Sequence, residues 1–146
     1  MAKRVTLYSA FLVLALSFSF LESLIPPIIL VPGIKLGLAN LVVIVMLYAL
    51  NTYSAFTINM IRIILCSMLF GTFTSFLYSI VGGLLSFAIM LIIKKTDKFS
   101  PMGVSICGAI AHNIGQISVG IILMEEFKIA FYLPVLLITG ALISVW

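Results

Sequence analysis

Long apolar runs, separated by short polar or irregular stretches, make up almost the whole chain. Most of these runs approach the roughly 20 residues that a helix needs to cross a bilayer. The pattern therefore predicts six membrane-spanning helices, of which the second is short. The predicted spans are Val5–Leu24, Leu38–Leu50, Tyr53–Phe70, Phe73–Ile93, Met102–Met124 and Ile129–Trp146.

The segment between the first two spans is apolar but does not have a helical pattern. Its sequence is IPPIILVPGIKLG, from Ile25 to Gly37, with three prolines and two glycines. Proline removes a backbone donor and clashes with the preceding turn, so a continuous helix is excluded here. Irregular backbone cannot face lipid tails. We therefore expect Ile25–Leu36 to be non-helical over much of its length and to cover the outer end of the helix bundle as a lid.

Composition strengthens the membrane interpretation. Hydrophobic residues make up 64% of the 146 residues and charged residues 8%, whereas soluble domains carry about 25% charged residues. So few charges cannot form a water-exposed surface, and the chain is predicted to be a single all-α transmembrane domain, residues 1–146. The net charge of +4 comes mainly from short flanks of the apolar runs, which indicates topology rather than nucleic-acid binding.

The basic flanks also predict the orientation. Lys3 and Arg4 precede the first span, and Lys94, Lys95 and Lys98 follow the fourth. With six spans these two groups lie on the same side, and basic loops favour the cytoplasm. We therefore expect a multi-pass cell-membrane protein with both termini in the cytoplasm.

Three polar residues interrupt the fifth predicted span, in the stretch GAIAHNIGQISVG. His112 and Gln116 are four residues apart and share one helix face, while Asn113 lies about 100° round the helix. Such groups either hold helices together by hydrogen bonds or bind a ligand. Ala111 and Gly115 form a small-x-x-x-small pair that permits close approach of another helix.

Arg62 lies in the middle of the third span, with Asn59 one turn before it, and Asn40 lies near the start of the second. A central Arg costs about 2.5–3.5 kcal/mol on insertion scales, so it should face the bundle interior. Glu22 is near the outer end of the first span, which leaves Arg62 without a deep carboxylate partner. We expect Arg62 and Asn59 to lie opposite His112 and Gln116, with room for an anionic or carbonyl-bearing ligand.

The motifs of soluble catalysis are missing from the sequence. It has no P-loop, no Ser–His–acid set and no paired carboxylates for acid–base chemistry. Cys66 and Cys107 do not form a CxxC pair, and His112 has no second ligand at metal-binding spacing. The chain is therefore predicted to be a non-enzyme without a cofactor or a metal site.

Four stretches resemble one family of small bacterial membrane proteins, the Gx transporter family, whose older label is heptaprenyl diphosphate synthase component I. The resemblance covers nearly the whole chain from Pro32 onward, and its most specific parts are the runs Pro-Gly-x-Lys-Leu-Gly-x-x-Asn and Ala-His-Asn-x-Gly-Gln. The stretches are PGIKLGLANLVVIVML, FLYSIVGGLLSFAIM, FSPMGVSICGAIAHNIGQ and YLPVLLITG.

The second span after its Pro-rich loop also looks like the substrate-binding S component of energy-coupling factor (ECF) vitamin transporters. That likeness implies a six-helix bundle with a small-molecule site near the outer surface, and partners comprising a transmembrane coupling subunit and two ATPases. S components commonly dock their partner through Ala-x-x-x-Ala on the first span, for which Ala15 and Ser19 are the nearest equivalent here. The substrate-binding residues would then be Asn40, Asn59, Arg62, His112, Asn113 and Gln116.

Two other functions remain open on the sequence. As the older label implies, the chain would be a non-catalytic membrane subunit associated with prenyl diphosphate synthesis, with Arg62 and Lys35 available for a diphosphate. Alternatively, it would be a structural membrane subunit of a redox or quinone-linked assembly, with no substrate of its own.

Overall fold

The computed structural model describes residues 2–24 and 38–125, together with six residues between 131 and 142. The first two ranges form five helices: α1 (Ala2–Leu24), α2 (Leu38–Ala49), α3 (Thr52–Phe70), α4 (Phe73–Lys95) and α5 (Pro101–Met124). These helices match the first five predicted spans to within a few residues. The lid segment, Lys35 and all but six residues of the sixth span lie outside the residues that can be described, so the count of six spans stays a prediction.

Three of the helices begin at polar residues that cap them. The side chains of Asn51, Thr72 and Ser100 accept hydrogen bonds from backbone N–H groups in the first turns of α3, α4 and α5, respectively. Each cap satisfies one of the donors that a helix start leaves open. At the start of α5, Pro101 follows its cap directly, where a missing N–H costs nothing.

Membrane-spanning length is reached by four of the described helices. α1, α3, α4 and α5 are long and apolar enough to cross a membrane, and α2 is a shorter apolar helix of 12 residues. These helices are compatible with the predicted membrane protein.

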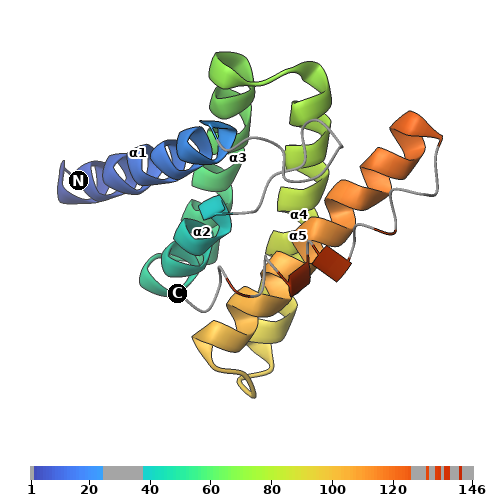
Figure 1. Ribbon diagram of the computed structural model, residues 1–146. Helices are drawn as coiled ribbons and strands as arrows, with labels where there is room; N and C mark the ends of the chain where they lie inside the picture. Colours follow the sequence, from blue (N-terminus) through green and yellow to red (C-terminus); the bar gives the residue numbers. More distant parts are fainter. Residues whose placement is uncertain are drawn as a thin grey trace.

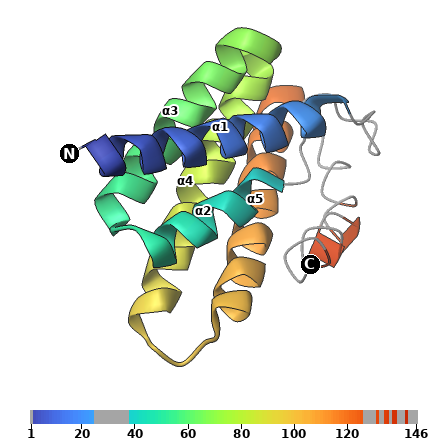
Figure 2. The same ribbon diagram turned by 90° about the vertical axis from the view of Figure 1, so that its left-hand side faces the viewer.

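The helices form two layers. In Figures 1 and 2, α3, α4 and α5 lie next to one another, while α2 crosses over all three and α1 crosses over α3. α4 lies between α3 and α5 and packs most extensively against α5. The core between the layers contains α2 residues such as Val43, Met46 and Leu47, none of which is exposed, and Ala15 of α1.

Lys94 joins the ends of two helices on one side of the bundle. Its ammonium donates a hydrogen bond to the carbonyl oxygen of Leu47, in the last turn of α2, and lies 4.7 Å from the ring centre of Tyr48. A cation is favourable at a helix C-terminus, where carbonyl groups lack helical partners. The ends of α2 and α4 therefore lie at the same end of the bundle, which is the arrangement that alternating spans require.

Candidate functional site

Arg62 is buried in α3 and holds three hydrogen bonds within the chain. Its Nε and Nη2 both donate to Oδ1 of Asn59, at 3.2 and 2.9 Å, and its Nη1 donates to Oγ of Ser19 at 3.0 Å. Only 6% of Arg62 is exposed. An Arg at this depth requires such partners, because an unpaired charge in an apolar medium is very costly.

Glu22 provides the negative charge that the sequence interpretation did not assign to Arg62. Although it lies in the last turn of α1, it is buried, and its carboxylate interacts favourably with the Arg62 guanidinium. Its Oε1 also accepts a longer hydrogen bond, 3.4 Å, from the backbone N–H of Leu38 at the start of α2. The expectation that Arg62 lacks a deep carboxylate partner was therefore wrong, because α1 crosses α3 and brings its final turn inward.

One face of α1 supplies this cluster. Ala15, Ser19 and Glu22 follow a helical spacing of four and three residues, and all three are buried. Ser19 was not among the predicted site residues, although its position between Ala15 and Glu22 on one face was a readable signal. Because Ala15 and Ser19 pack inside the chain, they do not form an exposed surface like the Ala-x-x-x-Ala face through which S components dock their partner.

The predicted site residue of α2 is also buried. Asn40 is 6% exposed, and its Nδ2 has no hydrogen-bond partner within the described part of the chain. The same holds for Nδ2 of Asn59, whose oxygen is engaged by Arg62. Two amide donors are thus buried in the bundle with hydrogen-bonding capacity left.

The three polar residues of α5 are all buried, including Asn113 on the neighbouring face. His112 is 5% exposed, Asn113 1% and Gln116 0%. The helix around them is rich in small residues, and Gly115 packs so closely that a Cβ there would lie 2.9 Å from Cα of Gly82 in α4. The small pair Ala111 and Gly115 was predicted to permit close helix approach, and the contact at Gly115 confirms this.

Two neighbouring glycines of α4 show where the polar residues of α3 lie relative to those of α5. A Cβ on Gly82 would lie 3.0 Å from the His112 ring, and one on Gly83 would lie 3.8 Å from Nδ2 of Asn59. Successive residues of a helix differ by only 1.5 Å in height and 100° in direction. His112 and Asn59 therefore meet α4 at the same depth from two sides.

Two further polar side chains of α4 belong to this region. Tyr78 and Ser86 lie one turn before and one turn after Gly82, on the same face, and both are completely buried. Their hydroxyl oxygens have no hydrogen-bond partner among the described residues. Sequence reasoning missed both as binding candidates, although the spacing of Tyr78, Gly82 and Ser86 was visible.

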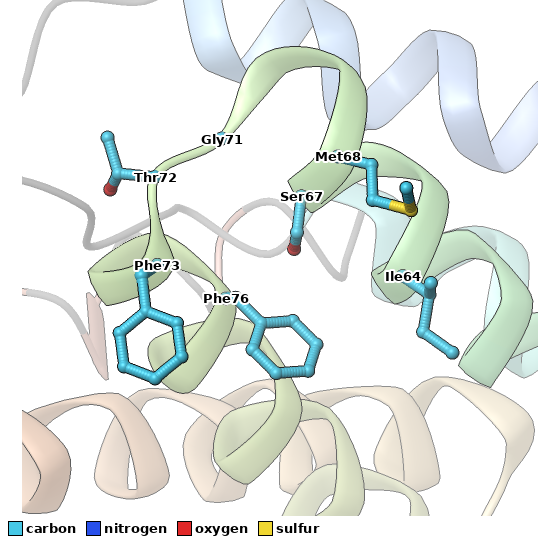
Figure 3. Close-up of a pocket in the computed structure, with 7 residues that line it drawn as sticks. All are labelled: Ile64, Ser67, Met68, Gly71, Thr72, Phe73 and Phe76. Carbon is cyan, nitrogen blue, oxygen red and sulfur yellow. The ribbon is translucent and has the colours of Figure 1, made fainter.

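The predicted site residues line neither of two open pockets on the described helices. One pocket, of about 310 Å³, lies below the turn between α3 and α4 (Figure 3). It is mostly apolar, with Met68, Phe73 and Phe76 among its walls. The other, of the same volume, lies between α1 and α3.

The chemistry available in the buried region is hydrogen bonding and charge. The amides of Asn40 and Asn59 offer donors, and the hydroxyls of Tyr78 and Ser86 can both donate and accept. Within the described ranges no group of three or more His, Cys, Asp or Glu side chains is placed to hold a metal ion. The arrangement is that of a site for a small polar molecule, or of a polar core that joins the helices.

Comparison with known proteins gives one match. The family model described as heptaprenyl diphosphate synthase component I matches residues 11–146. No curated protein and no solved structure matches the chain. Since the matched region begins near the middle of α1, before its first buried residue, and extends to residue 146, it includes the buried residues of every described helix. The chain therefore belongs to the heptaprenyl diphosphate synthase component I family.

Proposed function

We propose that this chain is the substrate-binding membrane subunit of a small-molecule transporter and has no catalytic activity of its own. The observation that carries the proposal is the burial of polar side chains between apolar helices, with amide and hydroxyl groups left to bind. Ionisable and polar residues inside membrane helices are costly and are commonly found along substrate pathways.

The buried side-chain groups that have no hydrogen-bond partner in the described chain indicate which kind of ligand would bind. Nδ2 of Asn40 and Nδ2 of Asn59 are donors without acceptors in the described chain. A substrate with carbonyl or other oxygen acceptors would pair with them, and the buried hydroxyls of Tyr78 and Ser86 would bind either kind of group. Because the Glu22 carboxylate interacts favourably with Arg62, a neutral carbonyl-bearing molecule fits this region better than an anion, the other kind of ligand that the sequence left open.

The resemblance to S components supports a further part of the proposal, and the basic flanks of the helices support the orientation. Transport would be powered by a transmembrane coupling subunit and ATPases, since the sequence carries no P-loop. Because Ala15 and Ser19 are buried, that coupling subunit would have to bind another surface. We also propose that both termini and the turn after α4 are cytoplasmic.

Ligand retention tests the binding role. The purified protein is expected to carry a small molecule, identified by mass spectrometry, which Asn40→Ala and Gln116→Ala lose at unchanged folded yield. Ser118→Ala is the control, because Ser118 lies on the same helix as Gln116 but is exposed. An identical retained molecule in all four proteins, or none in the wild type, contradicts the proposal.

Cysteine labelling tests the orientation. In a background with Cys66→Ser and Cys107→Ser, Asp97→Cys is expected to resist a membrane-impermeant thiol reagent in intact cells and to react after the membrane is opened. Asp97 lies in the exposed turn between α4 and α5. Efficient labelling from outside contradicts the cytoplasmic placement.

The family match favours a second function, that of a non-catalytic membrane subunit associated with prenyl diphosphate synthesis. A soluble prenyl diphosphate synthase would then supply the catalysis, and the chain would anchor it or hold its lipid product. This alternative predicts that the protein retains a soluble synthase on purification from its own membranes, whereas the transporter proposal predicts ATPases.

A further inference from the structure

A groove between α1 and α3 is separate from the buried polar region. Its volume is about 310 Å³, and it opens onto the outside of the bundle. Both helices are long enough to cross a membrane, so much of the groove faces lipid. Its lining residues are Val5, Tyr8, Ser9, Leu12, Tyr53, Ser54, Thr57, Ile58 and Ile61.

The lining changes character along the two helices. Apart from Val5, the lining residues toward the start of each helix carry hydroxyl groups, and Oγ of Ser54 donates to Oη of Tyr8 at 3.1 Å. Further along, the lining is aliphatic, with Leu12 on α1 and Ile61 on α3. A groove with a polar end and an apolar end matches a molecule that is itself polar at one end.

The side chain of Arg4 provides a positive charge near the polar end of the groove. Arg4 lies one helical turn before Tyr8, on the same side of α1, and its side chain is exposed. Tyr53, at the start of α3, is 79% exposed in the same part of the groove. Tyrosine and basic residues are enriched where a membrane meets water, so this end of the groove lies at the level of lipid headgroups.

We propose that the groove binds an anionic phospholipid, with one acyl chain along Leu12, Ile58 and Ile61 and the headgroup phosphate against Arg4. A lipid matches both ends of the groove, because its acyl chain suits the aliphatic side chains at one end and an anionic headgroup suits the positive charge of Arg4 at the other. The positive charge of Arg4 favours binding of an anionic lipid over a zwitterionic one. This site is independent of the substrate-binding role proposed above.

Native mass spectrometry of the full chain in detergent, titrated with phosphatidylglycerol or phosphatidylcholine, tests the proposal. The wild type is expected to bind phosphatidylglycerol about fivefold more tightly, the size of one basic side chain's attraction to an anionic membrane surface. Arg4→Gln should abolish this preference and Arg4→Lys should keep it. Lys98→Gln is the matched control, because it removes an exposed basic residue from the turn after α4.

A second variant tests the groove itself. Ser9 is exposed and lines the groove, so Ser9→Trp should fill it and weaken the binding of both lipids while helical content and elution profile stay unchanged. Equal binding of the two lipids by the wild type, or the same loss in Lys98→Gln as in Arg4→Gln, overturns the headgroup assignment. Undiminished lipid binding by Ser9→Trp overturns the groove.

Discussion

The interface between α1 and α3 and the interface between α4 and α5 are both buried, but they are held together differently. The first is a polar cluster in which Arg62 donates to Ser19 and Asn59 and interacts with Glu22. The second is a close approach of backbones, in which Gly82 and Gly115 come almost into contact. The difference shows two ways of joining helices where burial of apolar surface gives little driving force.

The two interfaces should also respond differently to substitution. A hydrogen-bonded charge cluster fails when one partner is removed, because the remaining charge is left buried. A glycine contact fails when atoms are added, because backbone cannot move aside as the end of a side chain does. The three predictions below use this contrast.

The largest effect is expected from Arg62→Met. The substitution keeps an unbranched apolar stem but leaves the Glu22 carboxylate buried without its counter-charge, which costs about 3–5 kcal/mol of the free energy of unfolding. The measurement is reversible unfolding in mixed micelles. Lys98→Met, at an exposed position in the turn after α4, is the control and should change stability by less than about 0.5 kcal/mol.

The double variant Arg62→Met/Glu22→Gln sharpens this prediction. Once both charges are gone, much of the lost stability should return, so the two substitutions are strongly non-additive. Simple addition of the two single effects would show that Glu22 does not serve as the partner of Arg62.

A smaller effect is expected from Gly115→Ala at the other interface. The new Cβ would lie 2.9 Å from Cα of Gly82 and 3.1 Å from its nitrogen, so the helices must separate, at a cost of about 1–3 kcal/mol. Gly103→Ala is the control on the same helix, because its Cβ would make only an ordinary contact, 3.5 Å from Phe99. Equal stability of the two variants would contradict close packing at Gly115.

The smallest effect is expected from Gly83→Ala, although its Cβ would lie only 2.7 Å from an atom of Ile63. That atom is the terminal Cδ1, which can rotate away, and alanine also favours the helix by up to about 1 kcal/mol. A net loss below about 1 kcal/mol is therefore expected in the same unfolding assay. In an Ile63→Val background, which lacks Cδ1, adding Gly83→Ala should raise stability relative to Ile63→Val alone; a loss there would place the obstruction in the backbone.

Much of the local structure could be predicted from the sequence. Apolar runs bounded by polar residues located α1 to α5, because hydrophobicity and helix length are properties of neighbouring residues. The burial of Arg62, Asn59, Asn40 and the α5 residues also follows from the cost of polar groups in lipid. The pairing of Arg62 with Glu22 could not be predicted in the same way, because Glu22 lies in the last turn when α1 is considered alone.

The sequence by itself determined which segments are helical, that they are apolar enough to cross a membrane, and that their few polar residues must be buried. Only the tertiary structure decided which of those residues meet. The crossing of α1 over α3 brought Ser19 and Glu22 to Arg62, and the glycines of α4 set His112 and Asn59 at one depth. Helix formation depends on nearby residues, whereas these contacts depend on crossing angles and distances between helices, which no single stretch of sequence encodes.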